Sequence, residues 1–560
     1  MVESTHARVF ILGLDGATFD LLDPWIDSGY LPNLEKLKRM SAWGVLQSTN
    51  PPTTPPAWTT CITGLNPGRH GVYDFTVSPL QDPNRPLVSS STAKGLKIWH
   101  IFNKFNKRCI VVNVPITYPP EPIDGIMISG MMTPSFESDF TYPNEIKHRI
   151  KAVCGNYIPN IDIPKYDVEL ESDAMAFLDD IKESFERRYE AVRHLMKSEK
   201  WDFFMVVFIL MDRIQHLFYK YLLPGSHLFN LPHAERIRQR VIEEYQRCDT
   251  AIGEIRDSLQ HQDMLFVISD HGFGSTDAYF NTNTWLLQNG FLAVNKWEYL
   301  KKSFQHHALT WGNSKLIKSV VPLHQLAKIR KAFRSKRSSF LSPKSDLVSV
   351  INWRETKAYF ASIPSQGIYI NESNNTISLS ETNSLKEQIS KKLSEIKNPI
   401  NGNKLIDQIW YREEIFKGNA TKFAPHILFR MNNYSILGRQ HLGSSQCFTI
   451  TQNEPNGFHR SEGVLIVAGK NIESGQINQA TITDILPSVL YASGLPIPEG
   501  LDGKILTALF KAKYLQSRTP QYFDLDISIE NSITQQSTIP YSDDEKKIVQ
   551  DRLKSLGYLE

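Results

Sequence analysis

Five short apolar runs along the chain predict buried strands. They are Val9–Leu14, Ile110–Val114, Phe203–Leu210, Leu265–Ser269 and Val464–Ala468. Each run is continuously apolar rather than alternating, which is typical of strands that helices cover on both faces of a sheet. We therefore expect a sheet enclosed between two layers of helices.

The segments between these runs carry a helical pattern. Leu34 and Leu37 lie on one face of a short helix, and two long helices are predicted over Ser172–Lys200 and Arg236–Leu259. Strands that alternate with helices are typical of the α/β class with a mainly parallel sheet. The stretch AYFASIPSQGIYIN, which begins at Ala358, predicts strands joined by a hairpin.

The C-terminal part reads as a polar tail that ends in a helix. Residues from 512 to about 541 are polar and predict loop. The last stretch, YSDDEKKIVQDRLKSLGYLE, predicts a helix, because Ser542 and Glu545 form a capping-box pattern, acidic residues fill the first turn and Gly557 ends it.

Residues 296–344 differ in charge from the rest of the chain. They contain twelve Lys or Arg residues and one Glu, whereas the whole chain has a net charge of only +3. Four apolar side chains there recur at helical spacing, namely Leu323, Leu326, Ile329 and Phe333. We interpret the segment as an insertion that caps a site for an anionic substrate or makes peripheral contact with an acidic lipid surface. A solvated basic helical excursion is an equal alternative.

The composition narrows the class of protein. The chain has 560 residues, of which 41% are hydrophobic and 22% charged, as in an ordinary globular protein. The small net charge gives no indication of a nucleic-acid-binding module, and oligomeric state is not predicted. The five cysteines are widely spaced and form no CxxC pair, which argues against a disulfide framework or a thiolate zinc site and favours a reducing compartment.

The chain shows no targeting or membrane-spanning signal. The N-terminal stretch MVESTHARVF lacks the apolar core of a signal peptide. The longest apolar run, Phe203–Met211, has nine residues, whereas a transmembrane helix needs roughly 20. We therefore expect a cytoplasmic location.

Side chains that commonly bind metals gather at the ends of the predicted strands. A buried, unpaired carboxylate such as Asp15 is costly, so it needs a cation or a hydrogen-bond partner; an N-cap role is the simpler alternative. In open α/β sheets, ligands bind beyond the carboxyl ends of strands. The candidate ligands are Asp15, Asp212, His216, Asp270, His271 and His459.

These six residues suit two divalent ions. Asp212 and His216 are four positions apart, which on a helix directs both side chains to one face. Asp and His are ligands for Zn, Mn or Mg. Two-metal phosphoryl sites use about three protein ligands for each ion.

The stretch from Thr49 to Phe75 contains a candidate nucleophile. It holds six threonines and five prolines, and two Pro-Pro pairs flank Thr53 and Thr54. The prolines restrict the backbone, so a hydroxyl is held on a stiff turn before a helix. A threonine hydroxyl is a poor nucleophile unless a metal lowers its pKa. The alternative is that the threonine only caps the N-terminus of a helix and that the prolines only mark the turn before it.

Taken together, these motifs resemble the alkaline phosphatase superfamily, in its type I phosphodiesterase and nucleotide pyrophosphatase branch. The resemblance covers most of the chain, and the motifs occur in the family's order. They are GLDGATFD, PNLEKL, PPTTPPAWTTCITGLNPGRHGVYDF, VNVPITYPPEPIDGIMISG, MDRIQHLF, SDHGFG, GFHRSEG and TDILPSVLYASGLPIPEGLDGKIL.

The resemblance implies a role for each candidate residue. Thr54 aligns with the family's nucleophile, nine positions before Thr63 of the TGL element, and Thr53 is the alternative if the register differs by one. Family members bind two divalent ions, commonly zinc. The implied ligands of one ion are Asp15, Asp270, His271 and Thr54, and those of the other are Asp212, His216 and His459.

One position departs from the family pattern. Nucleotide pyrophosphatases carry an Asn that binds a phosphoryl oxygen where this chain has Phe75. The sequence therefore does not identify the substrate-binding residues. Arg69, Lys94 or a basic residue of 296–344 could replace the Asn as the ligand of the phosphoryl oxygen, but no motif favours one of them. Sulfatase chemistry is disfavoured, because Cys61 is not followed by the x-P-x-R pattern.

The resemblance implies an alkaline-phosphatase-like α/β core and a metal-dependent phosphodiesterase that acts on a small phosphate ester or on a lipid or glycan headgroup. The alternatives are a phosphomonoesterase, a phosphonate hydrolase, a phosphoryl or headgroup transferase, and a non-catalytic binding protein. The expected segments are a first part of the core (1–294), a basic insertion or cap (295–400), a second part of the core with the last metal ligand (401–511), and a tail with a helix (512–560).

Overall fold

The computed structural model describes residues 7–77, 86–161, 166, 168, 170–299, 349–372, 377–442, 445–524, 541–555 and 558. Most of the basic segment 296–344, with its four apolar side chains at helical spacing, lies outside these residues, as does Gly557.

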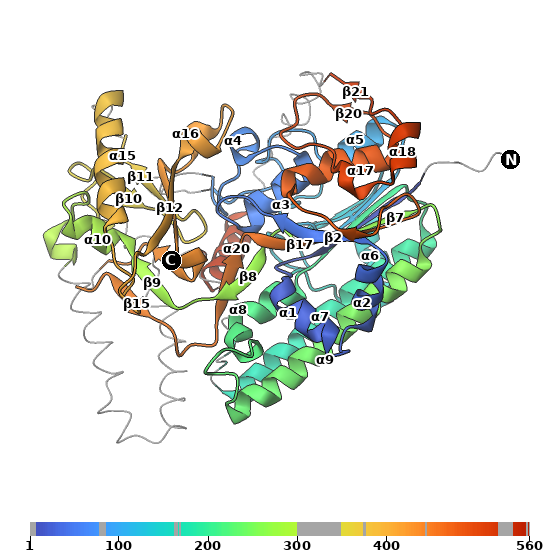
Figure 1. The fold of residues 1–560 in the computed structure, drawn as a ribbon, viewed down its shortest axis with the longest axis horizontal. Helices are drawn as coiled ribbons and strands as arrows, with labels where there is room; N and C mark the ends of the chain where they lie inside the picture. Colours follow the sequence, from blue (N-terminus) through green and yellow to red (C-terminus); the bar gives the residue numbers. More distant parts are fainter. Residues whose placement is uncertain are drawn as a thin grey trace.

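A central sheet runs through the larger part of the molecule (Figure 1). Five neighbouring strands, from β7 to β4, are parallel, whereas β17 is antiparallel to both of its neighbours. The strands in spatial order are β18 (Gly475–Gln476), β2 (Ala42–Gln47), β17 (Glu462–Ala468), β7 (Met264–Ile268), β1 (Val9–Leu14), β6 (Phe203–Phe208), β3 (Cys109–Val112), β4 (Gly125–Ile128) and β5 (Thr141–Tyr142), with β19 (Ala480–Thr481) also paired to β2. All five strands predicted from apolar runs are thus confirmed, with ends that shift by one or two residues.

Helices cover both faces of this sheet, as the continuous apolar runs predict. Along β1, Phe10, Leu12 and Leu14 face one hydrophobic core, and Val9 and Ile11 face the other. The first face packs against α1 (Phe19–Asp27), α2 (Pro32–Arg39), α6 (Glu145–Cys154), α7 (Glu171–Ser198), α8 (Leu210–Leu222), α9 (Pro232–Ser258) and α20 (Asp543–Ser555). The second face packs against α3 (Thr54–Thr63), α5 (Ile98–Lys104) and α17 (Ile485–Ser493).

A second, smaller sheet lies beside the central one, with its own hydrophobic core (Figure 1). It takes strands from three of the predicted segments, 1–294, 295–400 and 401–511. Its strands are β10 (Ala358–Phe360), β11 (Gly367–Ile370), β13 (Ile427–Met431), β14 (Ile436–Arg439), β9 (Ala278–Asn281) and β15 (Phe448–Ile450), with β12 (Ile406–Tyr411) also paired to β13. Its helices are α10 (Thr282–Gln288), α15 (Leu379–Ser394) and the short α16 (Arg412–Ile415). The predicted hairpin after Ala358 is confirmed, because β10 and β11 pair antiparallel.

Two pairs of short strands and a short helix lie outside these two sheets. Strand β8 (Gly272–Ser275) pairs with β16 (Gly457–Arg460), and β20 (Ile497–Pro498) pairs with β21 (Tyr522–Phe523). Helix α4 (Pro67–His70) follows α3.

The polar tail is more structured at its start than predicted. Residues 512–524 were expected to be loop, but they contain helix α18 (Ala512–Ser517) and strand β21. The reason is that Tyr514 and Leu515 pack against the second core, which a local polarity pattern does not reveal.

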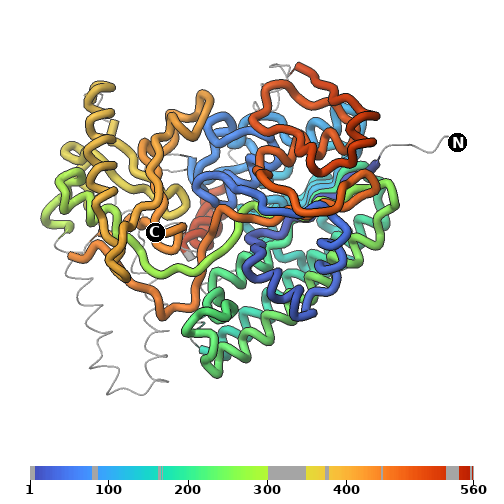
Figure 2. The backbone as a smooth tube through the Cα atoms, viewed as in Figure 1, coloured from blue at the N-terminus to red at the C-terminus, as the bar shows by residue number. Residues whose placement is uncertain are grey.

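The C-terminal helix lies between the two sheets, near the middle of the molecule (Figure 2). Its predicted capping box is confirmed: the Ser542 amide donates to Glu545 Oε2 at 3.0 Å, and the Glu545 amide donates to Ser542 Oγ at 3.3 Å. Val549 and Leu553 of this helix pack into the same hydrophobic core as Leu12 and Leu14 of β1.

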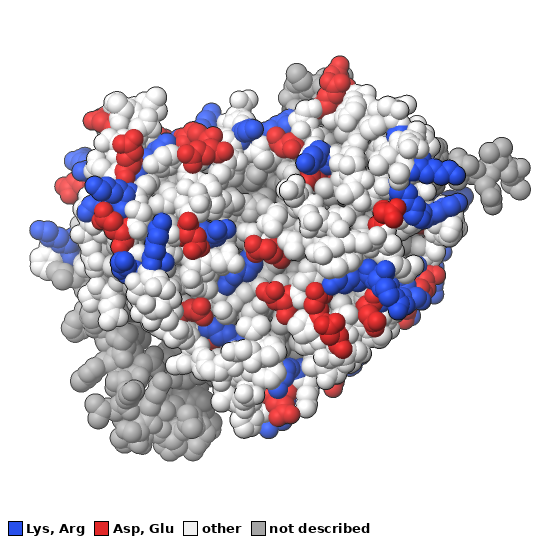
Figure 3. Space-filling model, in the orientation of Figure 1, with Lys and Arg blue, Asp and Glu red and all other residues white. Residues whose placement is uncertain are grey.

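The visible surface carries interspersed charges of both signs (Figure 3). Among the described residues, no helix has both the length and the apolar character needed to cross a membrane.

Gly272→Ala tests how closely the strands beside the predicted metal ligands approach. A Cβ at Gly272 would lie 2.0 Å from the Glu462 carbonyl oxygen, so β8 and β17 would have to separate. We expect a loss of about 2–3 kcal/mol of unfolding free energy, measured by urea denaturation. Gly225→Ala is the control, because no described atom lies within 4 Å of a Cβ there. Equal denaturation midpoints for the two variants would contradict this packing.

Candidate metal centre

The six predicted ligands converge at one edge of the central sheet. Asp15 follows β1, Asp270 and His271 follow β7, and Asp212 lies in the first turn of α8, just after β6. These three strands are parallel, so their carboxyl ends lie together. His459 lies on β16, before the antiparallel β17, and this reversal brings it to the same edge.

Asp212, His216 and His459 form one cluster of ligand atoms. His216 Nε2 and His459 Nε2 each lie 3.3 Å from Asp212 Oδ1, and the two nitrogens are 3.1 Å apart. Helix α8 brings Asp212 and His216 together, because side chains four positions apart share a face of a helix. All three residues are buried or nearly so, and they can hold one metal ion.

Hydrogen bonds orient the two buried histidines. His459 Nδ1 lies 3.1 Å from the Pro52 carbonyl oxygen, and His271 Nδ1 lies 3.1 Å from the Gly272 carbonyl oxygen. A carbonyl only accepts, so Nδ1 carries the proton in each ring and Nε2 keeps its lone pair. Burial also lowers the pKa of His459 to about 4 and holds that of His271 well below its usual value. Both rings are therefore neutral, which is the form in which a histidine can bind a metal ion.

The second cluster gathers around His271. Its Nε2 lies 3.2 Å from Asp270 Oδ2, 3.2 Å from Thr54 Oγ1 and 3.9 Å from Asp15 Oδ1. Asp212 reaches this cluster as well, because Asp15, Asp212 and His271 also have ligand atoms close enough to hold one ion. The two predicted ligand sets are thus neighbours, with Asp212 between them.

The carboxylates in both clusters lack the partners that burial demands. Among the described residues, Asp15 Oδ1, Asp212 Oδ1 and Asp270 Oδ2 are buried and accept no hydrogen bond. Burial, and then the neighbouring Asp212 carboxylate, raises the pKa of Asp15 to about 8. Burial followed by Asp15 raises the pKa of Asp270 well above its usual range. Unpaired oxygens of this kind, facing histidine lone pairs, fit divalent cations.

Arg213 is a residue of this site that sequence reasoning missed. Its guanidinium donates to Asp212 Oδ2 at 2.6 Å, and both side chains are buried. Burial opposes ionisation of Asp212, but His216 and Arg213 outweigh it and hold the pKa of Asp212 well below its usual value. Asp212 therefore stays ionised, with Oδ2 paired and Oδ1 left for the cluster. Adjacency in sequence was the only signal for Arg213.

Thr54 occupies the first position of α3, and Thr53 is its N-cap residue. Trp58, one turn later on the same helix, donates from Nε1 to Asp15 Oδ2 at 3.2 Å. Thr54 Oγ1 faces His271, whereas the buried Thr53 Oγ1 contacts no described hydrogen-bond partner. The structure thus places Thr54 at the clusters.

Tyr558 is the second residue that sequence reasoning missed. Its hydroxyl oxygen lies 2.8 Å from His216 Nε2 and 3.2 Å from His459 Nε2. Phe75, which replaces the family's Asn, stacks against the Tyr558 ring at a centroid distance of 4.7 Å. Only the tertiary fold brings residue 558 to this edge.

Arg69, one of the residues named as a replacement for the family's Asn, has other partners in the structure. Arg69 donates to the Gly500 carbonyl and pairs with Asp502 at 3.6 Å, so its guanidinium is engaged with that loop.

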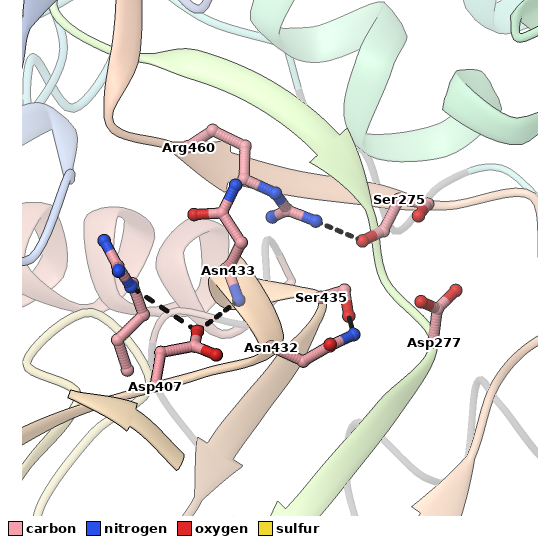
Figure 4. A pocket seen from close by; sticks show the side chains of 8 residues that line it. Ser275, Asp277, Asp407, Asn432, Asn433, Ser435 and Arg460 are labelled. Carbon is pink, nitrogen blue, oxygen red and sulfur yellow. Dashed lines mark hydrogen bonds and ion pairs between the residues drawn. The ribbon is translucent and has the colours of Figure 1, made fainter. Parts of the chain in front are cut away.

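A polar pocket of about 580 Å³ is lined by Arg460, the residue after His459, together with Asp277, Asp407 and their neighbours (Figure 4). Its charged groups already have partners: Arg460 donates to the Ser275 carbonyl, and Asp407 accepts from the Asn433 amide at 2.6 Å. Arg430 also pairs with Asp407 at 3.5 Å. The pocket therefore offers a phosphoryl group less than the clusters do.

Comparisons with known proteins identify the family of this chain and find solved structures with a similar fold. A model of the type I phosphodiesterase / nucleotide pyrophosphatase family matches residues 9–355. Phosphonoacetate hydrolase from Sinorhizobium meliloti 1021 has a TM-score of 0.50 and 14% identity, over 87% of this chain and 95% of that chain. Murine ectonucleotide pyrophosphatase / phosphodiesterase 5 has a TM-score of 0.45 and 11% identity, over 91% of this chain and 99% of that chain. No curated protein sequence matches.

The structural likeness confirms the predicted alkaline-phosphatase-like α/β fold, with its mainly parallel sheet between helices. The family model covers more than half of the chain. The protein therefore belongs to the type I phosphodiesterase / nucleotide pyrophosphatase family of phosphoester hydrolases.

Proposed function

We propose that this enzyme is a phosphodiesterase that uses Thr54 as its nucleophile and two divalent metal ions. The observation that carries the proposal is the convergence of unpaired carboxylate oxygens, neutral histidine nitrogens and the Thr54 hydroxyl at one buried edge. Its substrate would be a small phosphate ester or a lipid or glycan headgroup.

The ligands divide between the ions as the two clusters suggest. Asp15, Asp270 and His271, with Thr54, would hold one ion; Asp212, His216 and His459 would hold the other. Asp and His oxygens and nitrogens suit zinc, with manganese and magnesium as alternatives. When bound, the ions would lower the pKa of the nucleophile and offset the charge of the phosphoryl group.

The chain's own groups then account for the two half-reactions. Thr54 Oγ1 attacks phosphorus, forming an O–P bond as the bond to the leaving alcohol breaks. Water then attacks the phosphothreonine, releases the phosphate monoester and restores the hydroxyl. Thr54 lies at the N-terminus of α3, where the helix dipole favours negative charge. The ring of His271, 3.2 Å from Oγ1, limits where that oxygen can point.

The proposed function predicts a metal requirement and a preference for one class of substrate. Purified protein stripped with a chelator should lose activity and regain it with zinc, manganese or magnesium, and it should cleave bis-p-nitrophenyl phosphate faster than p-nitrophenyl phosphate. Faster monoester cleavage would favour a phosphatase, and faster phosphonoacetate cleavage a phosphonate hydrolase. Transfer of the phosphoryl group to an alcohol in preference to water would indicate a transferase.

The second prediction identifies the nucleophile. Thr54→Ala should lower kcat for the diester by about 10³-fold or more, because it removes the attacking oxygen. Metal stoichiometry should stay unchanged, because Asp15, Asp270 and His271 would still hold that ion. Thr54→Ser should retain measurable turnover. Thr53→Ala is the matched control and should stay within about fivefold of the parent. If Thr53→Ala abolishes turnover and Thr54→Ala does not, the adjacent hydroxyl is the nucleophile.

The third prediction uses the raised pKa of Asp15, which is about 8 against an ordinary value of 3.8. Between these values the folded metal-free protein holds a proton that the unfolded chain releases, so its stability falls as pH rises from about 4 to about 8. Asp15→Asn removes this penalty. In chelator, its Tm should exceed the parent's by about 2–4 °C at pH 8 and by less at pH 5.

With zinc present, the order should reverse, because the variant loses a ligand. Asp27→Asn, which changes an exposed carboxylate, should leave Tm unchanged in both conditions. A metal-free Asp15→Asn protein that is no more stable than the parent at pH 8 would contradict this prediction. It would show that other groups in the protein offset the cost of burying the ionised Asp15 carboxylate.

A further inference from the structure

Tyr558 reaches the metal centre from the C-terminal end of the chain. Its side chain is 1% exposed, and its hydroxyl oxygen lies 2.8 Å from His216 Nε2 and 3.2 Å from His459 Nε2. These are the two nitrogens that lie 3.3 Å from Asp212 Oδ1.

The hydroxyl lies beside the three candidate ligand atoms of this cluster. Asp212 Oδ1, the two histidine nitrogens and Tyr558 Oη have five recorded separations, which range from 2.8 to 3.3 Å. Ligand atoms around a tetrahedral zinc ion, about 2.0–2.1 Å from the metal, lie about 3.3 Å from one another. Catalytic zinc sites usually have three protein ligands and leave the fourth position to water or substrate. Tyr558 Oη, at 2.8 and 3.2 Å from the two histidine nitrogens, lies on the side of the cluster from which a fourth ligand could approach.

Packing holds the tyrosine ring in this position. The ring stacks on Phe75 with an interplanar angle of 22° and meets the edge of Phe458. The Tyr558 amide donates to the Leu553 carbonyl at 2.9 Å, which ties the residue to the last turn of α20. The hydroxyl is therefore placed by the fold.

Helix α20 is in turn anchored to the core by hydrogen bonds at both ends. Near its start, Glu545 Oε1 accepts from the hydroxyls of Tyr118 at 2.9 Å and Ser138 at 2.8 Å. Near its end, Arg552 donates to the carbonyls of Thr133 and Pro134, each at 2.8 Å.

We propose that the Tyr558 hydroxyl is the fourth ligand of the ion held by Asp212, His216 and His459, and that it competes with a phosphoryl oxygen for that position. The inference rests on the proposed two-metal function. The oxygen binds through a lone pair and keeps its proton, so no group is transferred. Substrate must displace the hydroxyl, which makes the C-terminal helix an intramolecular competitor.

The test compares Tyr558→Phe with the full-length parent. Tyr491→Phe is the control, because Tyr491 is buried on the other face of the sheet and its hydroxyl donates to the Arg518 carbonyl. Each protein is stripped and titrated with Co²⁺ by calorimetry while its visible spectrum is recorded. Inorganic phosphate is then titrated into the Co²⁺-loaded protein.

In Tyr558→Phe we expect one of the two Co²⁺ ions to bind about tenfold more weakly, with a changed visible spectrum. Phosphate should bind about fivefold more tightly, because its competitor is gone. Tyr491→Phe should match the parent in all three readouts. Arg552→Ala, which keeps the tyrosine but loosens its helix, should shift phosphate binding in the same direction.

Two results would overturn the inference. Unchanged cobalt affinity and spectrum would reduce Tyr558 to a packing residue, and weaker phosphate binding in Tyr558→Phe would make its hydroxyl a phosphate-binding group. The proposed function fails separately, if the parent binds fewer than two ions or if Thr54→Ala keeps its activity.

Discussion

Three carboxylates, those of Asp15, Asp212 and Asp270, are buried together at one edge of the central sheet, and the cost of burying their charges, increased by their mutual repulsion, is the constraint that governs this site. Arg213 neutralises one of them, but an oxygen of each remains without a hydrogen-bond partner among the described residues. Such an arrangement is stable only with bound cations or bound protons. The raised pKa values of Asp15 and Asp270 indicate that bound protons take this role in the metal-free protein.

The sheet makes this crowding unavoidable. Parallel strands β7, β1 and β6 are adjacent, so the residues that follow them cannot be far apart. Strand β16, which leads into the antiparallel β17, adds His459 from a part of the chain almost 190 residues later than Asp270. Helix α3 then presents Thr54 to the same edge and, through Trp58, holds Asp15 in place. One hydrogen-bonded framework thus positions the candidate metal ligands and the proposed nucleophile.

The C-terminal helix links the site to the end of the chain. Phe75 packs against Tyr558, so the position that departs from the family pattern contacts a residue that no local motif indicates. This pairing gives Phe75 a structural role: its ring supports a hydroxyl that lies among the histidine nitrogens. Departures from a family motif are therefore best interpreted together with what packs on them.

The sequence by itself predicted five strands of the central sheet, the long helices α7 and α9, the C-terminal helix and the candidate metal-binding residues, because apolar runs, helical spacing and costly charges after buried strands are local properties. It also indicated that Asp212 and His216 share a face. Only the tertiary structure decided that Asp212 lies between both clusters, that Thr54 rather than Thr53 faces His271, and that Tyr558 approaches His216 and His459. The second sheet likewise joins β9 to strands more than 150 residues away. The physical reason is that these contacts depend on strand order and helix docking, which bring together residues hundreds of positions apart and leave no periodic trace in the chain.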